Sequence, residues 1–283
     1  MKVDLFSIGH FTVHTYGVMI AIGVILCVVM GYYRAKRMEM KAESVLDLAI
    51  LCVVMGFLGA KVFFVILSWK QFLTDPLSVL RSSGFVVYGG IIFGVVSALI
   101  YCKIKNIRFF EYFDLLAPSV SLAQAFGRLG CFFAGCCYGK ETSLPIGIVF
   151  PEGSFAPAGV PLLPTQLFSS AGDFVIAFVL IRMTGKMRHT GDVGALYLML
   201  YGIGRFCVEF LRTNEQGGFI GLTTAQLISI VFMIISIVLF IRNKRAADRR
   251  NVVREKKKSI EFYTETGSEK PQSETVGRFS LSE

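Results

Sequence analysis

Apolar residues in this chain gather into long runs that are separated by short polar connections. Each run is close to the roughly 20 residues that an α-helix needs to cross a bilayer. We therefore predict an all-α polytopic membrane protein with about seven transmembrane helices. The predicted spans cover residues 11–33, 44–68, 84–102, 113–135, 165–182, 193–211 and 222–241.

Lysine and arginine are concentrated in every second connection. They follow the first, third, fifth and seventh spans, at residues 34–41, 103–108, 186–188 and 242–250, whereas the other connections carry fewer of them. Cytoplasmic loops of membrane proteins carry an excess of these residues. The N-terminus is therefore expected outside and the C-terminus in the cytoplasm. No small-residue cleavage site closes the first span, so we expect it to be retained.

Three regions differ in composition. Residues 1–242 form the predicted transmembrane domain. Within it, the long connection 136–164 contains Gly, Pro and a few strand-like residues, and we expect it to form an extracytoplasmic arm or cap. Residues 243–283 are basic and then rich in Ser, Thr and Glu. Such a segment cannot bury a core, so a disordered cytoplasmic tail is predicted, with its basic part against anionic lipid headgroups.

Overall composition supports a membrane protein. Hydrophobic residues make up 54% of the chain and charged residues only 17%, with a mean hydropathy of +0.61. Soluble domains carry about 25% charged residues. The net charge of +9 lies in the connections and the tail. This placement indicates attraction to a membrane surface and argues against a nucleic-acid partner.

Two arginines fall inside predicted spans, Arg128 in the fourth and Arg205 in the sixth. An arginine at the centre of a membrane helix costs about 2.5–3.5 kcal/mol on insertion scales, so it is kept where an anion or a wet cavity meets it. With the predicted orientation, Arg128 lies roughly 10 Å below the outer end of its helix. Arg205 reaches a similar depth.

Further polar residues are expected in the same outer-leaflet layer. Together with the two arginines they predict a cationic pocket for an anionic ligand, and an outer-leaflet phospholipid offers both a phosphate and acyl chains. The candidate pocket residues are Tyr16, Lys61, Tyr88, Gly89, Gln166, Tyr201 and Glu209.

Simpler interpretations stand beside this one. Arg205 and Glu209 are spaced for an ion pair within one helix. The tyrosines are also typical of membrane interfaces, and the glycines of close helix packing. Lys61 can extend to the outer headgroups.

Three cysteines, Cys131, Cys136 and Cys137, gather near the outer end of the fourth span. We favour small apolar residues in close packing. A disulfide or a reactive thiol is the second interpretation. A metal site is the least favoured, because such sites usually have four ligands and no histidine is near. No metal and no cofactor are predicted.

The chain resembles the prolipoprotein diacylglyceryl transferases over about residues 10–240. The combination, order and spacing of the shared motifs are specific to that family. They are Thr15-Tyr16-Gly17, Gly59-Ala60-Lys61, Gly89-Gly90, Gly127-Arg128-Leu129-Gly130, Pro164-Thr165-Gln166-Leu167 and Tyr201-Gly202-x-x-Arg205-Phe206-x-x-Glu209-Phe210-x-Arg212.

This resemblance implies transfer of diacylglycerol from phosphatidylglycerol to the lipobox cysteine of preprolipoproteins, the first step of bacterial lipoprotein maturation. It places the protein in the bacterial cytoplasmic (inner) membrane, with the active site toward the outer leaflet. Arg128 and Arg205 are expected to bind the phosphate, with Glu209 and Tyr201 in the same pocket. Signal peptides with a lipobox cysteine are the expected protein partners.

This chain departs from the family pattern at two places. Tyr88 stands where the family usually has a histidine, a candidate base for the thiol, so Tyr88 takes the candidate catalytic position. Cys131, Ala134 and Cys136 replace the family's amides and carboxylate. Two alternatives therefore remain: a lipid-headgroup transferase with another acceptor, and a non-enzymatic phospholipid-binding or transport protein. The apolar inner halves of the spans and the lack of an internal repeat disfavour a transporter.

Overall fold

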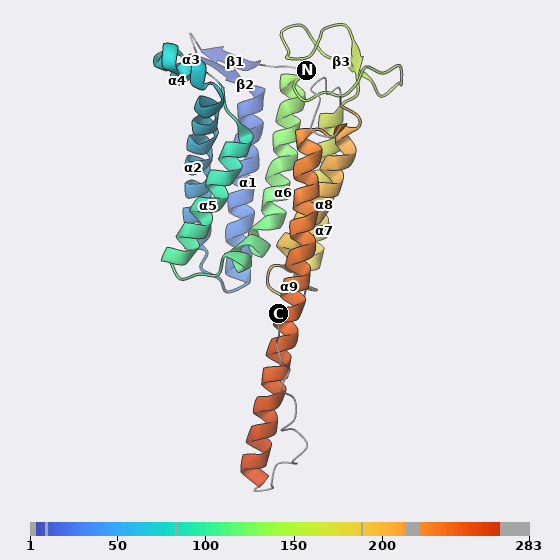
Figure 1. Ribbon diagram of the computed structural model, residues 1–283. Coiled ribbons are helices and arrows are strands. Elements are labelled where there is room, and N and C mark those ends of the chain that lie inside the picture. Colours follow the sequence, from blue (N-terminus) through green and yellow to red (C-terminus); the bar gives the residue numbers. More distant parts are fainter. Residues whose placement is uncertain (1–3, 9–10, 83, 188, 213–220, 267–283) are drawn as a thin grey trace. The chain divides into compact units, whose positions relative to one another are not determined.

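The computed structural model describes residues 4–8, 11–82, 84–187, 189–212 and 221–266. Helices dominate this part of the chain (Figure 1). The long ones are α1 (Thr15–Arg37), α2 (Glu43–Leu67), α5 (Val87–Ile104), α6 (Phe109–Ala134), α7 (Thr165–Thr184), α8 (Asp192–Glu209) and α9 (Thr224–Thr266). The short elements are α3 (Trp69–Thr74), α4 (Pro76–Arg81), β1 (Asp4–Ile8), β2 (Phe11–His14), β3 (Ile148–Val149) and β4 (Pro161–Leu162).

Each predicted span corresponds to one of the long helices, and most ends agree within a few residues. The first span differs at its start, because Phe11–His14 forms strand β2, antiparallel to β1, and α1 begins only at Thr15. The β-branched Thr12 and Val13 suit a strand. The prediction that the first helix starts at residue 11 was therefore wrong.

Five of the described helices are long and apolar enough to cross a membrane: α1, α2, α5, α7 and the segment Thr224–Asp248 of α9. Helices α6 and α8 are outside this set. They carry the in-span arginines Arg128 and Arg205, and α8 also carries Asp192 and Glu209. The two helices that lack the composition of simple membrane spans are thus the ones that bear the two candidate arginines.

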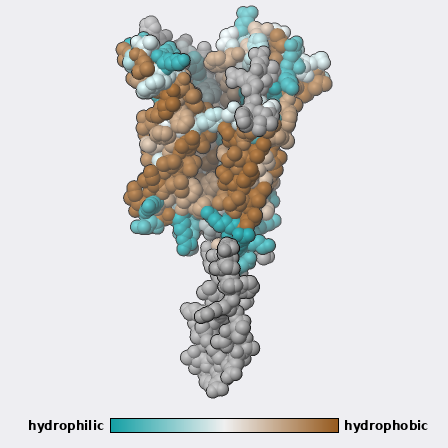
Figure 2. Space-filling model, in the orientation of Figure 1, coloured by the Kyte–Doolittle hydropathy of each residue, from teal (hydrophilic) through white to brown (hydrophobic). Residues whose placement is uncertain are grey.

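The helices of the unit Met1–Phe240 lie side by side in two groups. Helix α2 packs on α5, whereas α6 packs on α1, α7 and α8 (Figure 1). Apolar residues form a broad band on the face shown in Figure 2, with hydrophilic residues at both ends of the band. Such a band is the surface that the hydrocarbon of a bilayer requires.

Glycines allow α2 and α5 to approach closely. A Cβ atom at Gly59 would lie 2.5 Å from the carbonyl oxygen of Gly89, and one at Gly89 would lie 2.5 Å from the Cβ of Phe63. Membrane helices depend on such close backbone packing, because lipid supplies little hydrophobic drive for association. Gly89 therefore has a packing role between these two helices.

The connection between α6 and α7 is folded and attached to the helix ends. Gly135, with φ of 72°, ends α6 in the left-handed conformation, and the amide of Phe155 donates to the carbonyl of Ala134 at 3.1 Å. Strands β3 and β4 pair antiparallel within it. Phe150 is 1% exposed and contacts Phe132, with ring centroids 5.9 Å apart.

The last described helix extends beyond its predicted end. The unit Ile241–Glu283 continues α9 as far as Thr266, although we predicted disorder from residue 243. Alanine, arginine, lysine and glutamate are common in this stretch and are strong helix formers. The part of the predicted tail after Thr266 lies outside the described residues.

Candidate functional site

A pocket lies among α6, α7 and α8, and arginines from two of these helices line it. Its empty space is about 350 Å³, part of which is open to solvent. The enclosed part that a water-sized sphere can occupy is much smaller, about 50 Å³. The lining residues are Arg128, Phe168, Ser169, Gly172, Asp173, Ile176, Tyr201, Gly204, Arg205 and Val208. The pocket is therefore small and partly open, and two guanidinium groups lie at its wall.

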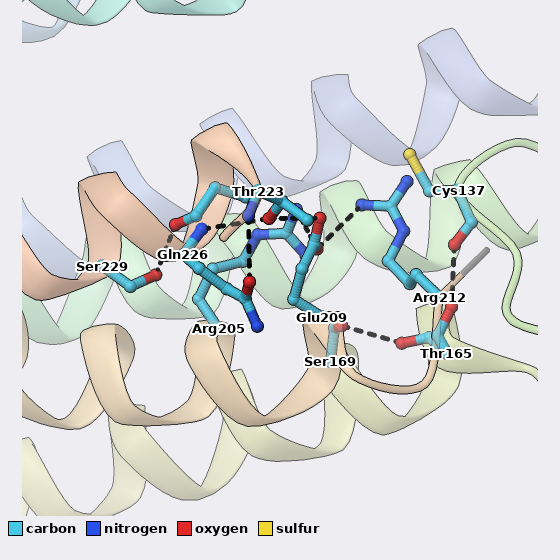
Figure 3. Close-up of polar contacts among 10 residues, drawn as sticks. Cys137, Thr165, Ser169, Arg205, Glu209, Arg212, Thr223, Gln226 and Ser229 are labelled. Atoms are coloured by element: carbon cyan, nitrogen blue, oxygen red, sulfur yellow. Dashed lines mark hydrogen bonds and ion pairs between the residues drawn. The ribbon is translucent and has the colours of Figure 1, made fainter. Parts of the chain in front are cut away.

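Arg205 is held by a carboxylate one helical turn away. Its Nη2 atom lies 2.8 Å from Oε2 of Glu209, and Nη1 of Arg212 lies 3.6 Å from the same oxygen (Figure 3). The Glu209 side chain is only 4% exposed. One carboxylate thus serves two arginines, so this cluster keeps an excess of positive charge. The predicted pair within the helix exists, and it positions Arg205 at the pocket without neutralising the site.

The start of α9 supports the same carboxylate. Oγ1 of Thr223 donates to Oε1 of Glu209 at 3.1 Å (Figure 3). The amide of Thr223 donates to Oε1 of Gln226 at 3.0 Å, while Oγ1 of Thr223 accepts from the amide of Gln226 at 3.3 Å. This reciprocal arrangement is a capping box, which fixes the helix terminus. Glu209 is therefore tied to a rigid element.

Arg128 points into the pocket from α6. Within the described ranges of the chain it makes no hydrogen bond or ion pair, although Asp173, Tyr201 and the thiols of Cys131 and Cys137 are near enough for electrostatic interaction. A guanidinium carries five donors. Its donors thus remain available for a ligand that enters the pocket.

Asp173 also lines the pocket. The sequence places it at the depth of the other polar residues, although it was not among the candidate site residues. Its side chain lies in α7, is 5% exposed and interacts electrostatically with Arg128. Ser121 of α6 donates to the backbone carbonyl of Asp173 at 2.8 Å, which ties α6 to α7. An acidic residue inside an apolar run was the available signal, because such residues usually mark functional sites.

Two glycines, Gly172 and Gly204, leave space in the pocket. A Cβ atom at either one would have no neighbour within 4 Å. Sequence reasoning did not find them, because nothing local distinguishes a glycine beside a cavity from one in close packing. Both glycines line the pocket and add no side chain to its wall.

Tyr201, as predicted, lies in the pocket with the two arginines. Its ring stacks on Tyr197 at 5.9 Å between centroids and packs against Phe232 at 6.2 Å. The hydroxyl of Tyr197 in turn donates to Oε1 of Gln124 at 2.8 Å. These contacts fix the orientation of the Tyr201 ring.

Gln166 is buried at the start of α7, where it holds the 136–164 connection. Its Nε2 donates to the carbonyl of Cys136 at 2.7 Å, and Oγ1 of Thr165 donates to the carbonyl of Cys137 at 2.8 Å. Gln166 is 1% exposed and is not among the residues that line the pocket.

Three predicted site residues lie on the α2–α5 pair. Nζ of Lys61 donates to the carbonyl of Ser82 at 2.6 Å and lies 5.2 Å from the centre of the Phe85 ring. Gly89 packs against α2, and Tyr88 at the start of α5 is 41% exposed. None of the three lines the pocket among the residues that the structure describes.

Tyr16 and the three cysteines lie beside the pocket. Tyr16 at the start of α1 is close to Gly130 of α6 and interacts electrostatically with Arg128 and with all three thiols. The pKa of the Cys137 thiol is lowered, first by hydrogen bonds with the side chains of Cys131 and Cys136, and further by the charges of Arg212 and Arg128.

Known proteins are similar to this chain over most of its length. The family model for prolipoprotein diacylglyceryl transferase matches residues 3–242. A Clostridium tetani protein named phosphatidylglycerol–prolipoprotein diacylglyceryl transferase is 42% identical over 242 residues, which are 85% of this chain and 97% of the relative. A second relative with that name, from Clostridium perfringens, is 41% identical over 86% of this chain and 96% of its own length. A Finegoldia magna relative of the same name is 34% identical over 85% of this chain and 95% of its own length. The chain therefore belongs to the prolipoprotein diacylglyceryl transferase family.

Proposed function

We propose that this protein transfers the diacylglyceryl group of phosphatidylglycerol to the lipobox cysteine thiol of preprolipoproteins. One observation carries the proposal: Arg128 and Arg205, from different helices, meet at one pocket beside Tyr201. An arginine pair suits a phosphate diester, because the planar guanidinium donates to two oxygens at once. The family relatives carry the name of this activity.

In the proposed reaction, the sulfur of the acceptor cysteine attacks the glycerol carbon that bears the phosphate. The sulfur–carbon bond forms as the carbon–oxygen bond breaks, and the electron pair leaves on glycerol phosphate. The thiol proton passes to a base or to solvent. Negative charge grows on the departing phosphate, and fixed donors stabilise such charge most strongly in a water-poor site.

Arg205 is the better fixed of the two donors and Arg128 the freer one. Glu209 holds Arg205 at 2.8 Å, which limits the reorganisation that lipid binding requires. Arg128 makes no ion pair in the described part of the chain, so an incoming phosphate supplies the partner. Tyr201 lines the same pocket and brings a hydroxyl as a further donor.

We further propose that α6 and α8 span the membrane together with the five apolar helices, with the N-terminus outside and the C-terminus in the cytoplasm. The Lys and Arg residues of alternate connections support this orientation. The pocket then faces the outer leaflet of the bacterial cytoplasmic membrane, where secreted precursors emerge. Fluorescent and periplasm-active reporters fused after residue 242 test the side of the C-terminus, and periplasmic activity would contradict it.

The decisive assay gives the purified full-length protein phosphatidylglycerol and a lipobox peptide. It measures both glycerol phosphate release and the mass of the lipidated peptide. Arg128→Ala and Arg205→Ala are expected to abolish both signals. Arg108→Ala is the matched control, because this arginine is 76% exposed and forms a surface ion pair with Glu111.

The alternatives predict other outcomes in the same assay. Glycerol phosphate release without peptide modification would indicate another acceptor. Lipid binding without release, from a folded protein, would overturn the transferase proposal in favour of a binding protein.

A further inference from the structure

The three thiols of Cys131, Cys136 and Cys137 converge at the junction of α6 with the 136–164 connection. Their Sγ atoms all lie within 4.8 Å of one another, and each residue is partly buried. The other cysteines, Cys27, Cys52, Cys102 and Cys207, lie elsewhere in α1, α2, α5 and α8. Close packing of the helices does not require three cysteines side by side, because a single cysteine packs as a small apolar residue without thiol neighbours.

The backbone that presents these thiols is held in place on several sides. The amide of Cys136 donates to the carbonyl of Cys131 at 3.1 Å. Gln166 and Thr165 donate to the carbonyls of Cys136 and Cys137 at 2.7 and 2.8 Å. Both donors are 1% exposed. The sulfur positions are thus set by buried contacts before any ligand arrives.

Cys137 has a strained backbone. Its φ is 61°, in the left-handed region that residues with a Cβ atom disfavour. Strain of this kind persists where the surrounding structure enforces it, and it often occurs at ligand-binding sites. The left-handed residue Cys137 follows the left-handed Gly135 by two positions. The chain turns here, and the thiol of Cys137 lies beside the thiols of Cys131 and Cys136.

We propose that Cys131, Cys136 and Cys137 form a binding site for a thiophilic d10 metal ion of the Zn²⁺ class. Three thiolate ligands select soft or borderline ions over Mg²⁺ or Ca²⁺. With Zn–S bonds of about 2.3 Å, the sulfurs around such an ion lie about 3.8 Å apart. The observed upper limit of 4.8 Å between the Sγ atoms is within about 1 Å of that value. A water molecule would complete the four-coordinate shell that Zn²⁺ prefers.

Charge supports this assignment. Three thiolates around a divalent ion carry a net charge of −1, which must be balanced in a site that is partly buried. Arg128 and Arg212 are close enough to Cys137 for electrostatic interaction, so positive charge is already present. A disulfide would use only two of the three sulfurs, whereas a metal ion accounts for all three.

The position of the site gives the ion a structural role. Cys131 is three residues after Arg128 on α6, so the two side chains lie on the same face of the helix. Cys136 and Cys137 belong to the connection. A bound ion would therefore join the turn that carries Arg128 to the 136–164 segment.

Metal binding is tested on the full-length protein purified in detergent under reducing conditions. We expect about one Zn²⁺ per chain by elemental analysis. Replacement by Co²⁺ should give thiolate-to-metal charge-transfer absorption. Both signals should be lost in Cys131→Ser, Cys136→Ser and Cys137→Ser, and kept in Cys207→Ser, an exposed cysteine outside the cluster. Equal metal content in the triple serine variant and the unsubstituted chain would overturn the proposal.

A second measurement needs no variant and so does not depend on whether the serine variants fold. Zn²⁺ added to the metal-free protein should slow maleimide labelling of these three thiols severalfold, and a chelator should reverse the effect. Unchanged labelling overturns the proposal. So does a disulfide among the three cysteines in protein alkylated directly in native membranes. These readouts use no lipid or peptide, so their failure is distinct from failure of the transferase assay.

Discussion

Arg128 of α6 and Arg205 of α8 line one pocket although they are 77 positions apart in the chain. Their electrostatic surroundings differ. Arg205 shares Glu209 with Arg212, whereas Arg128 faces the buried Asp173 without an ion pair among the residues described. The site thus contains one arginine with a fixed orientation and one whose donors are free. This division of roles leads to separate expectations for each part of the site.

Replacement of either arginine by lysine tests whether planar recognition matters beyond charge. Arg128→Lys and Arg205→Lys keep a positive charge but lose the two parallel donors that match a phosphate. We expect kcat to fall by about 10²–10³, the range for loss of one fixed donor to a developing anion. Steady-state release of glycerol phosphate measures this. Near-normal kcat in both variants would show that charge alone is sufficient.

Removal of Glu209 should destabilise the protein and disorder Arg205. Glu209→Ala leaves two arginines facing each other in a partly buried site, and breaking a buried pair costs about 3–5 kcal/mol. Thermal unfolding in detergent and the KM for phosphatidylglycerol should both change. Glu111→Ala is the control, because its pair with Arg108 has side chains 36% and 76% exposed. Exposed pairs contribute about 0–1 kcal/mol, so equal losses of stability would contradict the assigned role of Glu209.

Filling the pocket should block the lipid and leave the fold intact. Leucine at position 204 adds a side chain where a Cβ atom meets nothing within 4 Å. Gly204→Leu also improves helix propensity by about 0.8–1.0 kcal/mol. We expect unchanged or raised thermal stability with a KM for phosphatidylglycerol raised severalfold. Gly185→Leu, at an equally open glycine outside the pocket lining, should leave KM unchanged. Normal KM in Gly204→Leu would place the lipid elsewhere.

The 136–164 connection should loosen when its apolar anchor is removed. Phe150 is 1% exposed in a small core with Ala156 and Leu162. Truncation of a buried phenylalanine costs about 3–5 kcal/mol. Phe150→Ala should therefore speed proteolysis and amide exchange between residues 136 and 164. The matched control is Phe155→Ala, because Phe155 is 80% exposed. If both variants exchange alike, the core does not hold this segment.

The sequence by itself determined the helices and the central charges of the site. Hydrophobic runs about 20 residues long dictate membrane helices, and an arginine inside such a run must meet an anion or water. Spacing of four residues also predicts the Arg205–Glu209 pair, since it depends on one helix only. The hydrophobic pattern was a weaker guide to where the first and last helices begin and end. Strand β2 replaces the first residues of the first predicted span, and α9 extends past the predicted end of the seventh.

Only the tertiary structure decided which helices meet. Depth in the membrane is set by position along a helix, but neighbours are set by packing between helices that are distant in sequence. For this reason Lys61 and Gly89 share a predicted depth with Arg128 and yet lie on the α2–α5 pair. Lys61 binds the loop carbonyl of Ser82, and Gly89 allows α5 to pack closely on α2. The same long-range packing brings Asp173 to the pocket and fixes the backbone that gathers the three thiols.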